Sequence, residues 1–88
     1  MRILLVEDEN KTAAFLAKGL QEADFTVAIA QDGEAGLTRA RKEKFDLLIV
    51  DVMLPKMDGW NLVEKLRGDG TKIPILFLTA RDSVPDRV

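Results

Sequence analysis

Apolar residues along the chain gather in four short segments. Residues 3–6 and 75–78 are continuous apolar runs, residues 46–50 are almost wholly apolar, and residues 26–30 alternate in polarity. Short runs rich in branched side chains are typical of strands buried on both faces, whereas alternation is typical of a strand at a sheet edge. We therefore predict four strands, with residues 26–30 at an edge and residues 46–50 near the centre.

The segments between these strands carry apolar residues at helical spacing, each introduced by a residue that can cap a helix. Glu9 or Asn10 is expected to cap the first helix, and Asp32 and Asp58 are expected to cap the second and third. Gly19 lies inside the first helix, where glycine costs about 1 kcal/mol relative to alanine. We therefore expect Gly19 to be packed closely against the sheet.

Strand and helix alternate four times along the chain. A fourth helix is expected to begin at Ser83, because Pro85 suits an early helical position. The connections between successive strands and helices are short. This alternation therefore predicts a parallel sheet with right-handed crossovers and helices on both faces. A chain of 88 residues is enough for one small domain, which we expect to occupy residues 1–88.

Composition and charge exclude several classes of site. The chain has neither cysteine nor histidine, which excludes disulfides, thiolate or imidazole metal sites and imidazole catalysis. A net charge of −2 gives no electrostatic basis for binding nucleic acid or an anionic membrane. The apolar runs are too short to span a bilayer, and the N-terminus does not read as a signal peptide. We expect a soluble cytoplasmic domain in which oxygen atoms bind any metal.

Polar residues follow three of the predicted strands at their carboxyl ends. Glu7 and Asp8 follow the first strand, Asp51 directly follows the central one, and Thr79 follows the fourth. Functional loops of a parallel α/β sheet meet at this edge, so the carboxylates are expected to converge. Like charges at short range are unfavourable unless a cation neutralises them. We therefore expect Mg²⁺, bound by carboxylates and by the backbone carbonyl of Met53.

A carboxylate beside a bound cation is also a potential nucleophile toward phosphorus. Asp51 would form an acyl phosphate while the metal neutralises charge on the phosphoryl oxygens, and Thr79 would donate a hydrogen bond to that group. Taken singly, these residues have plainer interpretations: a solvated acidic turn at residues 7–9, a strand residue at Thr79 and a turn former at Asp51. Their shared place at one edge of a sheet favours the phosphoacceptor interpretation.

Three sequence segments together resemble the receiver domain of two-component response regulators, and the resemblance covers the whole chain. They are ILLVEDE at residues 3–9, FDLLIVDVMLPKMDG at residues 45–59 and PILFLTARDSVPDRV at residues 74–88. The resemblance implies a flavodoxin-like, doubly wound parallel sheet with strand order 2-1-3-4 in this chain. It also implies a sensor histidine kinase as the phosphoryl donor.

The same resemblance implies a role for each site residue. Asp51 corresponds to the phosphoacceptor, Glu7 and Asp8 to the acidic metal-binding pair, Met53 to the residue whose carbonyl binds Mg²⁺, and Thr79 to the switch hydroxyl. The acidic pair is Glu-Asp here where many members have Asp-Asp, which leaves Asp8 as the principal metal contact. Phosphorylation is then expected to switch dimerisation and, in a full-length parent, DNA binding and transcription.

A complete receiver has five strand–helix units. By this resemblance, residues 1–88 reach only into the fourth unit. We therefore expect an incomplete receiver domain from a longer regulator, without the fifth strand, its lysine and the last helices. LTARDSV at residues 78–84 is similar to the branch that carries a winged-helix DNA-binding domain, and the N-terminal residues are similar to regulators of heavy-metal resistance. The unpaired apolar edge at residues 75–78 is expected to favour a homodimer or a swapped assembly.

Two other functions are weighed against the phosphorylation switch. An aspartate-based phosphatase would need a second acid and a threonine after Asp51, but Met53 and Pro55 occupy those positions and supply no proton donor. The other is a phosphorylation-impaired fragment that acts only as a fold or dimerisation module, and the sequence leaves this alternative open. Nucleotide binding is disfavoured because the loop at residues 7–9 is acidic and has no glycine motif.

Overall fold

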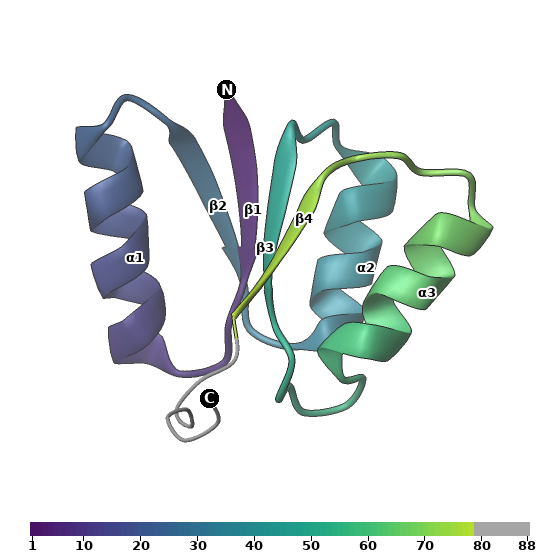
Figure 1. Ribbon diagram of the computed structural model, residues 1–88. Coiled ribbons are helices and arrows are strands. Elements are labelled where there is room, and N and C mark those ends of the chain that lie inside the picture. Colours follow the sequence, from purple (N-terminus) through teal and green to yellow (C-terminus); the bar gives the residue numbers. More distant parts are fainter. Residues whose placement is uncertain (79–88) are drawn as a thin grey trace, which may run out of the picture.

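The computed structural model describes residues 1–78, in which four strands and three helices alternate (Figure 1). The elements are β1 (Arg2–Val6), α1 (Asn10–Glu22), β2 (Thr26–Ala30), α2 (Gly33–Lys42), β3 (Leu47–Asp51), α3 (Gly59–Gly68) and β4 (Ile75–Leu78). The strands are parallel in the order β2-β1-β3-β4, which confirms the predicted doubly wound sheet. The helix predicted from Ser83 lies outside the described residues. None of the helices in residues 1–78 has the length and apolar content needed to cross a membrane.

The register of the sheet places the carboxyl ends of β1 and β3 side by side. Val6 of β1 lies opposite Val50 of β3, so the residues that follow each of them begin at the same edge. Asp51 is itself the last residue of β3, paired with Leu78 of β4, whereas the sequence predicted that the strand ends at Val50. The ladder extends by one residue because the backbone N–H of Val52 still donates to the Leu78 carbonyl at 3.1 Å.

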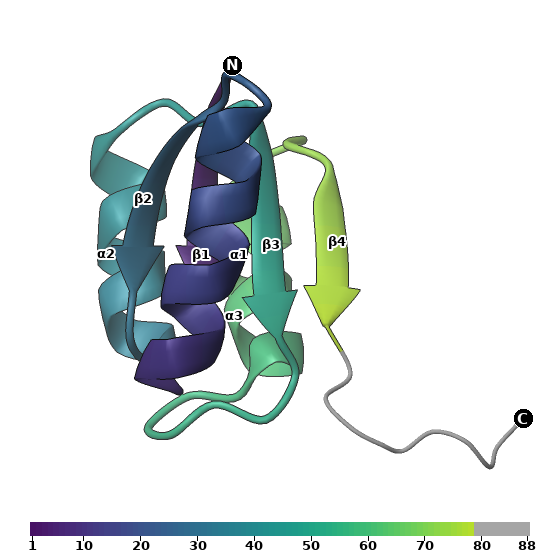
Figure 2. The same ribbon diagram turned by 90° about the vertical axis from the view of Figure 1, so that its left-hand side faces the viewer.

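Each face of the sheet has its own apolar cluster, and the two faces are covered unequally. Leu4 and Val6 of β1 pack into the cluster formed with α2 and α3, whereas Ile3 and Leu5 pack into the cluster formed with α1 (Figure 1). Within residues 1–78, α1 is the one helix on the second face, where it contacts β1 and β2. β4 lies at one edge of the sheet that residues 1–78 form (Figure 2), and Leu76 on it is 55% exposed.

The three helices in the described part of the chain begin at acidic caps. Glu9, Asp32 and Asp58 each accept a hydrogen bond from the backbone N–H three residues further on, at 2.8, 2.8 and 2.9 Å respectively. Each bond satisfies one of the N–H groups that the first turn of a helix leaves without a partner. The predicted caps of α2 and α3 are confirmed, and Glu9 is the cap of α1.

Close packing occurs at other glycines than the one predicted. Gly19 has nothing within 4 Å of the place where a Cβ atom would be, so the prediction that it packs against the sheet is wrong. A Cβ atom on Gly33 would lie 1.9 Å from the Met57 carbonyl oxygen, and one on Gly59 would lie 2.6 Å from the Asp51 carbonyl oxygen. Glycine is therefore required where α2 and α3 begin, beside the segment that follows Asp51.

Candidate functional site

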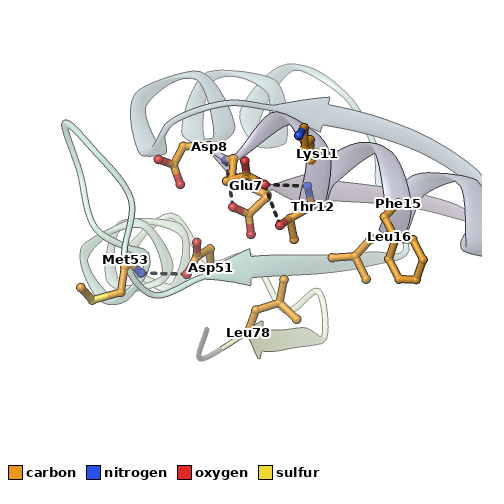
Figure 3. A pocket seen from close by; sticks show the side chains of 10 residues that line it. Glu7, Asp8, Lys11, Thr12, Phe15, Leu16, Asp51, Met53 and Leu78 are labelled. Carbon is orange, nitrogen blue, oxygen red and sulfur yellow. Dashed lines mark hydrogen bonds between the residues drawn. The ribbon is translucent and has the colours of Figure 1, made fainter. Parts of the chain in front are cut away.

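Three carboxylates converge where β1 and β3 end (Figure 3). One oxygen from each of Glu7, Asp8 and Asp51 lies within 4.8 Å of the others. Glu7 and Asp51 are only 5% and 4% exposed, whereas Asp8 is open to solvent. The register of β1 and β3 therefore brings together the three acids that the sequence predicted to converge.

The surroundings of Glu7 disfavour its negative charge. Burial raises the pKa of Glu7, and the nearby charges of Asp51 and Asp8 raise it further. The Glu9 N–H, which donates to Glu7 Oε2 at 2.9 Å, opposes this rise in part. Among the ion pairs formed within residues 1–78, none involves any of the three acids.

This donor set fits a hard divalent cation. Buried carboxylates that lack a cationic partner carry a large desolvation cost, and a shared metal ion removes most of it. Mg²⁺ accepts one or two carboxylates, a carbonyl oxygen and several waters, and the exposed side of Asp8 leaves room for waters. Glu7, Asp8 and Asp51 are thus the residues that would hold the ion.

The residues after Asp51 restrain its carboxylate. The backbone N–H of Met53 donates to Asp51 Oδ1 at 3.0 Å, a bond drawn in Figure 3. The Met53 side chain is 68% exposed and lines the same pocket. That the Met53 carbonyl binds a metal stays a prediction, and Thr79 lies outside the described residues.

A pocket of about 810 Å³ opens beside the acids. Its other wall comes from α1, which contributes Lys11, Thr12, Phe15 and Leu16, with Leu78 of β4 below (Figure 3). Phe15 is 78% exposed although it is a large apolar residue. The acidic site is therefore open to an incoming molecule across an apolar surface.

The loop between β3 and α3 is fixed to the start of α2, a feature that the sequence did not indicate. The Pro55 carbonyl accepts hydrogen bonds from the N–H of Met57 at 2.7 Å and from the N–H of Gly33 at 3.5 Å. Lys56, which lies between Pro55 and Met57, has a φ of 68°, a conformation that residues other than glycine rarely adopt. The one signal of this contact in the sequence is the glycine directly after the helix cap Asp32. A Cβ atom at Gly33 would meet the Met57 backbone, so only glycine fits there.

Comparison with curated proteins identifies relatives that regulate transcription. The chain is 56% identical over 88 residues to the transcriptional activator protein IrlR of Burkholderia pseudomallei, all of this chain matching 38% of that protein. It is 48% identical over 87 residues to the transcriptional regulatory protein PcoR of Escherichia coli, again 38% of the relative. The chain therefore spans less than half the length of these relatives.

Solved structures share the fold. The receiver domain of the Francisella response regulator 1452 matches with a TM-score of 0.88 and 29% identity, over 93% of this chain and 68% of that one. The Thermotoga maritima response regulator TrrA, solved in complex with Mg²⁺ and BeF, matches with a TM-score of 0.75 and 31% identity, over 77% of this chain and 59% of that one. TrrA thus shares this fold and was solved with Mg²⁺.

The family model of the response regulator receiver domain matches residues 3–88, nearly the whole chain. The parallel sheet, the acids at the ends of β1 and β3 and the sequence relatives agree with this match. This chain belongs to the receiver domain family of two-component response regulators.

Proposed function

We propose that Asp51 accepts a phosphoryl group from a sensor histidine kinase while Mg²⁺ is bound by Glu7, Asp8, Asp51 and the Met53 carbonyl. The observation that carries this proposal is the convergence of three carboxylate oxygens within 4.8 Å, two of them on side chains almost fully buried. In the proposed reaction, a free oxygen of Asp51 attacks phosphorus. A P–O bond forms, the P–N bond to the donor imidazole breaks, and its electron pair returns to that imidazole nitrogen.

The chain's own residues prepare Asp51 for this step. The Met53 N–H holds Oδ1, so the carboxylate cannot rotate freely and its other oxygen is the nucleophile. The bound cation would neutralise charge on the transferred phosphoryl oxygens. Thr79 is proposed to donate its hydroxyl hydrogen to one of those oxygens. Hydrolysis of the acyl phosphate by water would restore the carboxylate, so the only chemistry proposed is self-phosphorylation and self-dephosphorylation.

We also propose that residues 1–88 are an incomplete receiver domain within a longer cytoplasmic regulator of transcription. The support is that the chain matches only 38% of IrlR and of PcoR, both named as transcriptional proteins. DNA binding would belong to a domain outside this sequence, because a net charge of −2 gives this part no overall electrostatic attraction for nucleic acid. Phosphorylation would shift an existing equilibrium toward a dimer.

A second proposal concerns association of the 88-residue chain through β4. This edge strand has the sequence ILFL, and Leu76 on it is 55% exposed. Such an edge is a template for pairing with a second copy, as a homodimer or by exchange of segments. Analytical ultracentrifugation should therefore detect a dimer at micromolar concentrations. A stable monomer would contradict this proposal and leave the one on Asp51 unaffected.

Mg²⁺-dependent phosphorylation tests the main proposal. The protein is incubated with acetyl phosphate, and the intact mass is followed with Mg²⁺ present or removed by a chelator. We expect one phosphoryl group to be added only with Mg²⁺. Asp8→Asn should raise the Mg²⁺ requirement at least about tenfold, because even residues that only support metal ligands have effects of this size. Asp24→Asn, in the turn after α1, is the matched control and should behave like the wild type.

A further inference from the structure

Two aromatic rings connect the beginning of α3 to β4. The ring centroids of Trp60 and Phe77 lie 4.4 Å apart with an interplanar angle of 44°. Aromatic pairs at this separation and tilt stabilise each other beyond the burial of their surfaces. Trp60 is the second residue of α3, and Phe77 is the third residue of β4.

Both partners of this pair lie next to residues that contact Asp51. On the helix side, Gly59 directly precedes Trp60. The Gly59 N–H donates to the Val52 carbonyl at 3.0 Å, and a Cβ atom on Gly59 would lie 2.6 Å from the Asp51 carbonyl oxygen. On the strand side, Phe77 directly precedes Leu78, which is paired with Asp51. The Trp60–Phe77 contact therefore joins the two segments that flank the proposed nucleophile.

Burial in the core does not explain this tryptophan. Trp60 is 58% exposed, whereas Leu62 and Leu66 on the same helix are fully buried and fix α3 to the sheet. β4 is one of the two edge strands and is hydrogen-bonded only to β3 within the described sheet (Figure 2). An additional contact to β4 has its largest effect at such an edge, because fewer other contacts oppose local opening.

We propose that Trp60 is a positioning residue for the reaction of Asp51. By stacking on Phe77 it holds the carboxyl end of β4 against the first turn of α3, and thereby fixes Leu78 beside Asp51. The inference rests on the proposed function of Asp51. Its structural half, that Trp60 holds the end of β4 in place, can be measured without any phosphorylation; its functional half is the effect of this contact on the reaction rate.

Hydrogen exchange measures the structural half. The Val52 amide donates to Leu78 across the β3–β4 ladder and reports on the end of β4. The Glu7 amide donates to Ala30 at 2.9 Å between β1 and β2, away from β4, and is the internal reference. In Trp60→Ala, we expect the Val52 amide to exchange about two- to tenfold faster, the range that one aromatic pair supports. The Glu7 amide should not change, and Trp60→Phe should restore slow exchange at Val52. Glu64→Ala, on the exposed side of α3, is the matched control.

Phosphorylation by acetyl phosphate at saturating Mg²⁺ measures the functional half. Trp60→Ala should lower the rate about two- to tenfold and leave the Mg²⁺ affinity by calorimetry unchanged, while Trp60→Phe should restore the rate. Unchanged exchange at Val52 would overturn the inference, as would faster exchange at every strand amide, which would mean general destabilisation. Local opening with an unaltered rate would overturn the positioning role. A wild type that takes up no phosphoryl group would overturn the proposed function, and the positioning role with it.

Discussion

At the scale of single residues, the two buried acids of the site are held by the same kind of contact. Glu7 accepts a hydrogen bond from the N–H of Glu9, and Asp51 accepts one from the N–H of Met53, each two residues further along the chain. Such local bonds fix a carboxylate with respect to its own backbone. Each acid thus has one oxygen held by the protein, and the remaining oxygens are available to a cation or to phosphorus.

Lys56, five residues after Asp51, carries local backbone strain. Its φ of 68° disfavours a residue with a Cβ atom by about 1–2 kcal/mol, whereas glycine adopts this conformation without that cost. Lys56→Gly should therefore raise the free energy of unfolding by about 0.5–1 kcal/mol, after the greater flexibility of glycine in the unfolded chain is subtracted. Urea unfolding measures this difference.

Lys56→Ala separates strain from charge. Lys56 Nζ lies 3.8 Å from Asp32 Oδ2, an exposed pair that contributes little to stability. Alanine removes the pair but keeps the Cβ atom, so Lys56→Ala should leave stability within about 0.5 kcal/mol of the wild type. Equal stabilisation by glycine and alanine would show that strain at this residue is not the cause.

At the scale of elements, the β3–α3 loop is docked on the first turn of α2. A methyl group at Gly33 would meet the backbone of Met57, which cannot move without displacing the loop after Asp51. Gly33→Ala should therefore lower the free energy of unfolding by about 1–3 kcal/mol, the usual cost of overpacking. It should also weaken Mg²⁺ binding, because the loop carries Met53.

Gly19→Ala is the matched control in α1. Nothing lies within 4 Å of its Cβ position, so alanine should stabilise the helix by about 0.5–1 kcal/mol. Thermal unfolding of the two variants should thus give shifts of opposite sign. Destabilisation by both would contradict the assignment of Gly33 as the packed glycine.

The C-terminal end of α2 is tied to β1 by a charged network. Glu43 accepts from Arg39 Nε at 2.9 Å and from Arg2 Nη2 at 2.7 Å, and the bonds from these guanidinium groups lower its pKa from 4.5 to about 2. Because the pKa is lower in the folded state, this stabilisation is fully present above pH 4.5 and is lost as the pH falls toward 2.

Glu43→Gln should therefore flatten part of the acid unfolding profile. Between pH 4.5 and about 2 the melting temperature of the wild type should fall more steeply than that of the variant. Glu64→Gln, an exposed acid on α3, serves as the control and should retain the wild-type slope. Parallel profiles for Glu43→Gln and the wild type would show that the network does not contribute to stability.

At the scale of the whole molecule, local sequence patterns predicted most of the fold. Alternating polarity predicted β2 and an apolar run predicted β4, each to the residue, and acidic residues predicted the caps of α2 and α3. The shared carboxyl edge of a parallel sheet predicted the convergence of Glu7, Asp8 and Asp51. Strands and caps depend on residues that are neighbours in the sequence, and the parallel topology follows from the alternation of strands and helices along the chain.

Features that depend on contacts between distant segments could not be predicted in this way. Gly33 touches Met57, and Trp60 touches Phe77, across 24 and 17 positions of sequence respectively. The expectation for Gly19 was wrong for the same reason, because helical spacing alone does not show whether a neighbouring element approaches that side of the helix.

The central claim is that Asp51, assisted by Mg²⁺, is the phosphoacceptor, and chemical trapping tests it most directly. After reaction with acetyl phosphate, borohydride reduces an aspartyl phosphate to homoserine, and peptide mass spectrometry identifies the modified position. We predict homoserine at position 51 when Mg²⁺ is present and none when Mg²⁺ has been chelated or when Asp51 is replaced by asparagine. Homoserine at another aspartate, or at position 51 regardless of Mg²⁺, would contradict the account.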